Sequence, residues 1–452
     1  MRQSRAGQAI PSQAIPSQGS VSQSVPSQTM AGSGASAEAA NEQPITATDW
    51  QHHAATLRLP ADPAQTRLIE ISLALAPRSR WRRGLPSVTL TAAGQAPLTY
   101  SLEARRREQR IAWRLPPCTT EVTLSLALSG ARLTGAPQAR CHAQPAIEAP
   151  ILIVAPHPDD AEIAAGGLYT DHAESVHLVT LSCGEQLKGL KRQYLSGLDD
   201  DLDSAVRRKA EWRRWNVFAT PLLSGIPPER STLVGVPDGA GWALVHDGIA
   251  QRPAIALSEA RRFNHLALPP IRGERLERDD VVAALRQLID TLQPVTLLVT
   301  DPEFDPHPDH RAASLALALA LDGSRHRPRT VLLYANHYRD AFPPGPAFQP
   351  AWMPPAEIAI ERLFTPAPTP LAWPLSTEMQ KHKALLLDAM SDLSPRAGWS
   401  QRRRRARRAN FVPTFARERD PYFQAAIRST ELFRALPSDA FVAAWRGRND
   451  AC

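Results

Sequence analysis

The sequence predicts a mixed α/β protein in which a mainly parallel, doubly wound sheet follows a small β-sandwich-like module. From residue 151 onward, short unbroken apolar runs alternate with helical segments, as expected where parallel strands are buried on both faces. Between residues 45 and 148, apolar side chains instead recur at every second position, which is typical of half-buried strands. The chain has 452 residues, 43% of them hydrophobic and 21% charged, which is enough for two or three globular domains.

Residues 1–44 form a low-complexity tail of Ser, Gln, Pro, Ala and Gly, with almost no aromatic or branched apolar side chains. Such a composition buries too little apolar surface to offset the entropy lost on ordering, so we expect the tail to be disordered. In residues 45–148, prolines and glycines separate the alternating runs, which predicts a small antiparallel sandwich. This accessory domain is interpreted either as a packing or oligomerisation module or as a sugar-binding domain.

The predicted α/β core spans residues 149–340. Strands are expected at residues 151–155, 177–181, 231–236, 296–300 and 331–335, and helices at residues 161–175, 204–218, 279–292 and 310–321. The run of Ala and Leu at residues 314–321 alternates like a strand, but a parallel sheet needs a crossover there, so we predict a helix. Residues 341–452 are expected to be a Pro-rich and helical extension that packs on the core, with helices at 376–393 and 420–436.

The basic charge of the chain is local. The formal net charge is +7, but six arginines lie in one cluster at residues 402–405, 407 and 408, and the rest of the chain is near neutral. A nucleic-acid-binding protein would spread basic residues over a whole face with aromatic residues between them, so no nucleic-acid partner is expected. The arginine cluster itself fits a solvated loop, a contact for phosphate or anionic lipid headgroups, or local nucleic-acid binding.

The four cysteines are far apart and form no Cys-x-x-Cys pair, so disulfides are not implied. The N-terminus lacks the apolar segment of a signal peptide, and the longest apolar run, residues 312–321, is too short to span a bilayer. We therefore expect a cytoplasmic protein. The sequence does not predict its oligomeric state.

Two motifs rich in His and Asp follow predicted buried strands. The first, His-Pro-Asp-Asp at residues 157–160, follows the strand at 151–155, and the second, His-Pro-Asp-His at residues 307–310, follows the strand at 296–300. Because ligands bind at the carboxyl ends of the strands in an open α/β sheet, we expect the two motifs to meet there. Alone, the first motif also fits a helix cap and the second a solvated loop, but the pair favours a functional site.

Within these motifs, His157, Asp160 and His310 form a predicted metal-binding set. Three protein ligands with a vacant position are typical of catalytic zinc, whereas structural zinc sites are closed and more often use cysteine. Zinc in such a site lowers the pKa of a water molecule to about 7 and polarises an amide carbonyl. The sequence therefore predicts one zinc ion per chain and a hydrolytic reaction.

Three further residues are assigned roles around this set. We expect Asp159 to take a proton from water and to deliver it to the leaving amine. His307 is expected to stabilise the oxyanion of the tetrahedral intermediate, and Asp309 to orient a ligand histidine. A magnesium-dependent phosphohydrolase is a rival interpretation of acidic residues at the end of a strand, but the two ligand histidines favour zinc over magnesium, which prefers oxygen.

The run APHPDDAEIAAGGL at residues 155–168, together with His-Pro-Asp-His at 307–310, resembles the PIG-L / LmbE-like family of deacetylases. The resemblance covers roughly residues 150–340 and implies a Rossmann-like fold. It also implies zinc-dependent removal of acetyl groups from N-acetylglucosamine derivatives and related amides. Within that family, the matching positions supply the metal ligands, the general base and the oxyanion-stabilising histidine already assigned above.

The resemblance extends between the two motifs. Arg208 matches the arginine of the family's Arg-x-x-Glu helix, which contacts substrate, and Asp238 matches the family's Asp-Gly pair, so both are expected to bind substrate. Arg208 alone also fits an exposed helix charge. The C-terminal part departs from the family pattern, since Asp392 stands where glutamine is expected and Lys383 and Glu431 only approximate family features. This departure leaves the identity of the substrate open.

The predicted partner is an amino-sugar-containing small molecule or glycan, with anionic lipid or phosphate as a second partner at the arginine cluster. Two alternative functions remain. One is an amidase that acts on a non-sugar or thiol-conjugate amide, and the other is a catalytically inactive, sugar-binding relative. An active enzyme is favoured because every expected ligand and the expected base are present.

Overall fold

The computed structural model describes residues 44–76, 85–103, 106–187, 194–271, 273–338, 348–355, 358–390 and 426–449. The predicted tail up to residue 43 and the arginine cluster at 402–408 lie outside the described residues. All of these described residues belong to one compact unit. Among the helices of the described part, none has the length and apolar character needed to cross a membrane.

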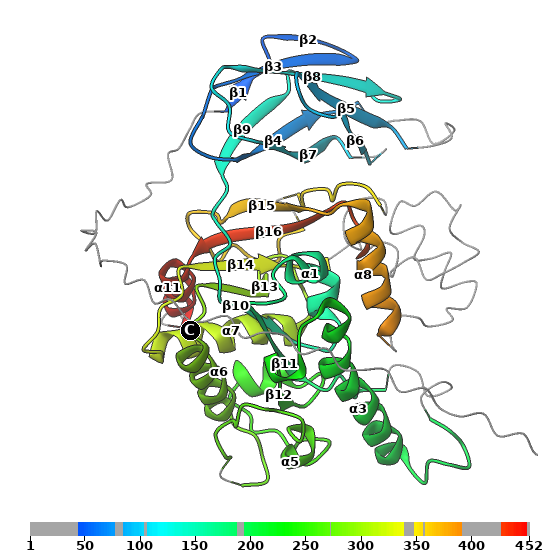
Figure 1. Ribbon diagram of the computed structural model, residues 1–452, viewed down its shortest axis with the longest axis vertical. Helices are drawn as coiled ribbons and strands as arrows, with labels where there is room; N and C mark the ends of the chain where they lie inside the picture. Colours follow the sequence, from blue (N-terminus) through cyan, green and yellow to red (C-terminus); the bar gives the residue numbers. More distant parts are fainter. Residues whose placement is uncertain are drawn as a thin grey trace, which may run out of the picture. The chain divides into compact units, whose positions relative to one another are not determined.

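The N-terminal module consists of two antiparallel sheets (Figure 1), with strand orders β1-β9-β4-β7 and β2-β3-β8-β5-β6. The strands are β1 (Ile45–Thr46), β2 (Asp49–Gln51), β3 (Ala54–Leu59), β4 (Arg67–Ala74), β5 (Ser87–Ala92), β6 (Leu98–Ser101), β7 (Glu108–Leu115), β8 (Val122–Ser129) and β9 (Gln138–Ala143). Alternate side chains, such as Leu57 and Leu59 of β3 and Ile69 and Ile71 of β4, are buried in one shared core. The β-rich module predicted from the period-two pattern is confirmed.

A seven-stranded sheet follows, in the order β12-β11-β10-β13-β14-β16-β15. Its strands are β10 (Ile151–Ala155), β11 (Val176–Ser182), β12 (Ser231–Val236), β13 (Thr296–Thr300), β14 (Thr330–Tyr334), β15 (Thr369–Pro374) and β16 (Thr430–Pro437). The five strands from β10 to β14 pair in parallel, whereas β16 pairs antiparallel with both β14 and β15. Since β10 and β13 are neighbours, the loops that follow them leave the sheet at the same edge.

Helices cover both faces of this sheet. They are α1 (Asp160–Asp171), α3 (Leu202–Ala219), α4 (Gly241–Val245), α5 (Leu257–Ala260), α6 (Arg278–Leu292), α7 (Pro308–Gly323), α8 (Thr377–Ala389) and α11 (Ser438–Asn449), with short 3₁₀ turns η1 (Pro221–Ser224) and η2 (Pro228–Arg230). Leu152 and Val154 of β10 share a core with α6, α7 and α11, whereas Ile151 and Ile153 share another with α1 and α8. Figure 1 shows α1 beside α8 and α6 beside α7. The mixed α/β class and the helix predicted through residues 314–321 are confirmed.

The helix predicted at residues 420–436 is wrong, because Thr430–Pro437 form strand β16. The segment is rich in good helix formers, but it pairs along its length with β14 on one side and β15 on the other. Glu431, Phe433 and Ala435 are buried at alternate positions, as a strand requires. The C-terminal extension therefore completes the sheet in addition to supplying helices.

Candidate active site

Two loops meet at the carboxyl end of the parallel strands. One follows β10 and leads into α1, which begins at Asp160, and the other follows β13 and leads into α7, which begins at Pro308. His157 and Asp160 come from the first loop and its helix, and His310 from the first turn of α7. All three of these side chains are buried.

The side chains of His157, Asp160 and His310 converge. His157 Nδ1 lies 3.1 Å from Asp160 Oδ2, and His310 Nε2 lies 3.2 Å from the same oxygen. One donor atom from each residue lies within 4.8 Å of the other two. The three predicted metal ligands are thus close enough for one cation to bind them all.

The hydrogen bonds of the two histidines leave one lone pair of each facing Asp160. In its neutral form, His310 donates from Nδ1 to Asp305 Oδ2 over 2.8 Å and carries its lone pair on Nε2, a buried nitrogen that has no hydrogen-bond partner among the described residues. His157 Nε2 donates to Asp309 Oδ2 over 3.1 Å, which leaves Nδ1 facing Asp160. Because two lone pairs and a carboxylate oxygen repel one another unless a positive charge lies between them, the group fits a metal ion.

The surrounding charges also favour a cation. Burial lowers the pKa of His310, but the carboxylates of Asp160 and Asp305 outweigh it and raise the pKa to about 10. Burial likewise lowers the pKa of His157, but the neighbouring carboxylates of Asp160, Asp238 and Asp309 outweigh it and hold the pKa well above its ordinary value. Burial raises the pKa of Asp160, but the two histidines hold that pKa well below its usual range. Positive charge is therefore stabilised at this point.

His307 lies beside the ligand histidines, with its ring centroid 5.2 Å from that of His157 and 4.8 Å from that of His310. Burial and the two neighbouring histidines lower its pKa to about 4. His307 is therefore neutral at about pH 7 and keeps one N–H to donate. Such a donor suits the predicted role of stabilising an oxyanion.

An arginine that the sequence analysis did not single out holds Asp159. Arg213 of α3 is 4% exposed, and its Nη2 donates to Asp159 Oδ1 over 3.2 Å and to the Pro158 carbonyl over 3.3 Å. Gly184, at φ +66°, leaves room for this side chain, since a Cβ there would lie 2.5 Å from Arg213 Nε. Arg213 stands in a run of basic residues whose spacing does not distinguish it, so the sequence offered no signal.

Asp309 lies behind His157 and fixes its ring. Besides His157 Nε2, its carboxylate accepts the backbone N–H groups of Gly239 and Gly241, over 2.7 and 2.8 Å. Gly241 allows this close approach, because a Cβ there would lie 2.9 Å from Asp309 Oδ1. The hydrogen bond between Asp309 and His157 therefore fits the predicted role of Asp309, which is to orient a metal-binding histidine.

The two residues expected to bind substrate are placed differently. Asp238 Oδ1 lies 3.2 Å from His157 Nε2, and Asp238 Oδ2 accepts the backbone N–H of Gln186 over 2.8 Å. Asp238 is therefore part of the site and lies beside His157, one of the predicted metal ligands. Arg208 instead forms an ion pair with Asp199, and 41% of its side chain is exposed.

Two further residues complete the site. The Asp305 carboxylate accepts His310 Nδ1 and the backbone N–H groups of His307, Asn336 and His337. Asn336 follows β14 and is 1% exposed. Asp305 and Asn336 follow β13 and β14, so both lie at the carboxyl ends of parallel strands, where the two motifs were also expected. The sequence analysis did not identify them, because a single Asp or Asn belongs to no recognisable spacing pattern.

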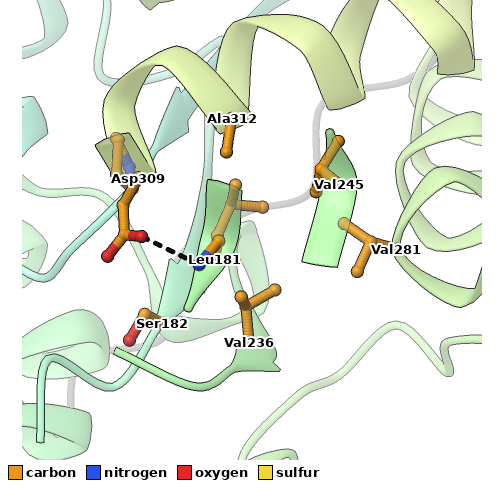
Figure 2. Close-up of a pocket in the computed structure, with 9 residues that line it drawn as sticks. Leu181, Ser182, Val236, Val245, Val281, Asp309 and Ala312 are labelled. Carbon is orange, nitrogen blue, oxygen red and sulfur yellow. Dashed lines mark hydrogen bonds between the residues drawn. The ribbon is translucent and has the colours of Figure 1, made fainter. Parts of the chain in front are cut away.

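A small apolar pocket adjoins Asp309 (Figure 2). Its lining comes from the loop after β10 and from β11, β12, α4, α6 and α7, and is apolar apart from Ser182 and Asp309. Figure 2 shows the Asp309 carboxylate at one end of the pocket and Val281 at the other. Asp309 thus lies between the ligand group and the apolar core, where low polarity strengthens its hydrogen bond to His157.

Residues 152–321 match the family model described as PIG-L: GlcNAc-PI de-N-acetylase. The matched segment contains both His/Asp motifs, so the resemblance found in the motifs is confirmed. A comparison with curated proteins gives no match.

Several solved structures are similar to parts of the chain. The conserved protein TT1542 from Thermus thermophilus is 16% identical over 64% of this chain and 94% of its own, with a TM-score of 0.32. GalB, the 4-carboxy-2-hydroxymuconate hydratase from Pseudomonas putida, is 17% identical over 63% of this chain and 95% of its own, with a TM-score of 0.33. A CBM35 module in complex with a glucuronic acid-containing disaccharide is 14% identical over 20% of this chain and 66% of its own, with a TM-score of 0.16. Similarity this low supports no conclusion about activity.

Proposed function

From the match of residues 152–321 to the PIG-L family, we propose that this protein is a zinc-dependent hydrolase that removes the N-acetyl group from an N-acetylglucosamine-type sugar. The family match by itself indicates a hydrolase of the deacetylase or amidase type. The observation that carries the metal is His310 Nε2, a buried nitrogen that faces Asp160 and has no hydrogen-bond partner in the described part of the chain. Two nitrogen ligands and one oxygen ligand suit zinc better than magnesium or calcium.

When bound, zinc supplies a water of lowered pKa and polarises the amide carbonyl. Asp159 then takes the proton of the attacking water and delivers it to the amine that leaves. Arg213 keeps the Asp159 carboxylate in one orientation through its hydrogen bond. His307 donates its N–H to the oxyanion. Asp305 and Asp309 hold the two ligand imidazoles.

Arg208 and Asp238 are proposed to contact the sugar. Arg208 is accessible enough to exchange its ion pair with Asp199 for a sugar hydroxyl or phosphate. The Asp238 side chain is only 6% exposed and lies against His157. It is therefore proposed to contact the part of the sugar that lies beside His157.

The same proposal includes the finer architecture. A Rossmann-like, doubly wound core is supported by the strand order, in which β11 and β12 extend to one side of β10 and β13 and β14 to the other. The proposed organisation is a tail at residues 1–44, an accessory domain at 45–148, a catalytic core at 149–340 and a C-terminal extension of that core at 341–452. The proposed location is the cytoplasm, and the proposed partners are an amino-sugar compound and, at the arginine cluster, anionic lipid or phosphate.

Two alternatives use the same site. An amidase for a non-sugar or thiol-conjugate amide needs the same ligands and base, with a different pocket. A sugar-binding protein without activity needs neither Asp159 nor Arg213, so the partly buried hydrogen bond between these two residues favours an enzyme.

The test is release of acetate from a panel of N-acetylglucosamine compounds and other N-acetyl amides, with zinc added. Wild type is expected to deacetylate at least one sugar, and Asp159→Asn to lose about 10²- to 10⁴-fold in kcat. Asp203→Asn, an exposed aspartate at the start of α3, is the control and should match wild type. Activity on other amides alone would select the amidase, and no activity on any amide would select the binding protein.

A further inference from the structure

A buried carboxamide contacts one of the proposed metal ligands. Asn336 Nδ2 donates to Asp160 Oδ1 over 2.8 Å and to the Asp160 carbonyl over 3.0 Å. Both of these oxygens are acceptors, so the donor end of the amide must face Asp160. The orientation of Asn336 is therefore fixed by its partners.

The two carboxylate oxygens of Asp160 consequently have different surroundings. Oδ1 accepts from Asn336, whereas Oδ2 accepts the backbone N–H of His157 over 2.9 Å and faces both ligand imidazoles. A carboxylate free to rotate can bind a cation through both oxygens and so fill an additional coordination position. A catalytic zinc needs that position open for water and substrate.

We propose that Asn336 is a positioning residue that makes Asp160 a one-oxygen ligand and thereby keeps a coordination position of the metal open. This inference rests on the proposed metal-dependent function. The backbone of Asn336 strengthens the same arrangement, because its N–H donates to Asp305 Oδ2 over 3.0 Å, and Asp305 holds His310. Asn336 thus connects the ligands that come from the two loops, although it belongs to neither motif.

The side chain can be tested separately from the backbone. Asn336→Ala removes the amide donor and keeps the N–H to Asp305, whereas Asn336→Leu also fills the space that the carboxamide leaves. Asn216→Ala is the matched control, because Asn216 is another buried asparagine, 5% exposed, whose Nδ2 donates to the Ala389 carbonyl. Its loss affects packing of α3 and leaves Asp160 untouched.

The experiment loads each full-length protein with Co²⁺ and records its visible absorption, then measures zinc affinity by competition with a chelator. Four-coordinate cobalt absorbs more strongly than five- or six-coordinate cobalt. Both Asn336 variants are expected to show a weaker band than wild type and Asn216→Ala, and a zinc affinity lower by about 10- to 100-fold. A purely structural role of Asn336 would lower thermal stability and leave the spectrum unchanged.

The outcomes separate this inference from the proposed function. If wild type binds cobalt and zinc but the Asn336 variants keep its spectrum and affinity, the positioning role is overturned while the metal site stands. If wild type binds neither metal, the proposed function fails and the positioning role fails with it.

Discussion

Asp305 shows at the scale of single residues how hydrogen bonds to one carboxylate fix the side chains of the site. Its two carboxylate oxygens accept the imidazole N–H of His310 and three backbone N–H groups, and these donors follow β13 and β14. The carboxylate therefore sets the tautomer of His310 and anchors the chain after β14 at the same time.

Replacing Asp305 by Asn is expected to weaken zinc binding by about 10- to 100-fold, since an amide accepts these hydrogen bonds less well and presents a donor to some of them. Isothermal titration of the metal-free protein measures the affinity. Asp290→Asn is the control. Asp290 also accepts several hydrogen bonds, one from a hydroxyl and two from backbone N–H groups, but it lies outside the site. An affinity equal to that of the control would show that Asp305 does not position His310.

Arg213, like Asp305, acts by positioning another side chain, in this case the carboxylate of Asp159. Arg213→Met frees the Asp159 carboxylate from its hydrogen bond, and we expect kcat to fall by about 10²-fold with little change in KM, because misplacement of a reacting group costs rate more than binding. Arg213→Lys should recover part of the rate. Steady-state kinetics on the substrate found in the acetate assay measures both. A rise in KM with unchanged kcat would instead make Arg213 a substrate-binding residue.

Helix α1 shows at the scale of elements how distant segments support the site. The helix is kinked at Ala165, where φ is −135°, and the Glu431 carboxylate of β16 accepts the N–H groups of Gly167 and Leu168 beyond the kink. Lys383 of α8 donates to the same carboxylate over 2.5 Å, and both charged side chains are almost fully buried. Strand β16 and helix α8 thus fix the helix that begins with Asp160.

Lys383→Met is expected to destabilise the protein by about 3–5 kcal/mol, because it leaves the Glu431 charge buried without its partner. Urea unfolding measures the change. The matched control is Lys381→Met on the same helix, where the ion pair with Glu378 is exposed and its loss should cost less than about 1 kcal/mol. Equal destabilisation by the two variants would contradict the importance of the buried pair.

The sheet β1-β9-β4-β7 of the N-terminal module also contains a glutamate with basic partners. Glu70 of β4 binds Arg110 of β7 and His142 of β9, over 2.9 and 3.0 Å. Burial raises the pKa of Glu70, but these two partners outweigh it and hold the pKa below its ordinary value of 4.5. A carboxyl whose pKa is lower in the folded state stabilises the protein above its unfolded pKa and loses that effect as pH falls.

Wild type is therefore expected to lose more stability than Glu70→Gln as pH falls below the ordinary value of 4.5. Urea unfolding at a series of pH values measures the difference between the two proteins, which should be largest above that value and shrink below it. A difference that stays constant with pH would show that the Glu70 charge does not contribute.

At the scale of the whole molecule, the sequence predicted the elements whose pattern is local. Continuous apolar runs located the parallel strands, and the motifs after β10 and β13 predicted the three side chains that converge at the site. The sequence could not show that Thr430–Pro437 pair with β14, because a short segment of helix formers becomes a strand only when a sheet edge is available. Arg213, Asp305 and Asn336 were missed for a related reason, since their roles arise from contacts between segments far apart in the chain.

The central claim is that His157, Asp160 and His310 together bind one metal ion. The most direct measurement is zinc content by elemental analysis, after exposure to zinc and gel filtration, of wild type, His310→Ala and the control His326→Ala, whose ring lies outside the site against the Pro294 carbonyl. The account predicts about one zinc per chain in wild type and the control, and a large loss in His310→Ala. Wild type without zinc, or His310→Ala that retains the full content, would contradict it.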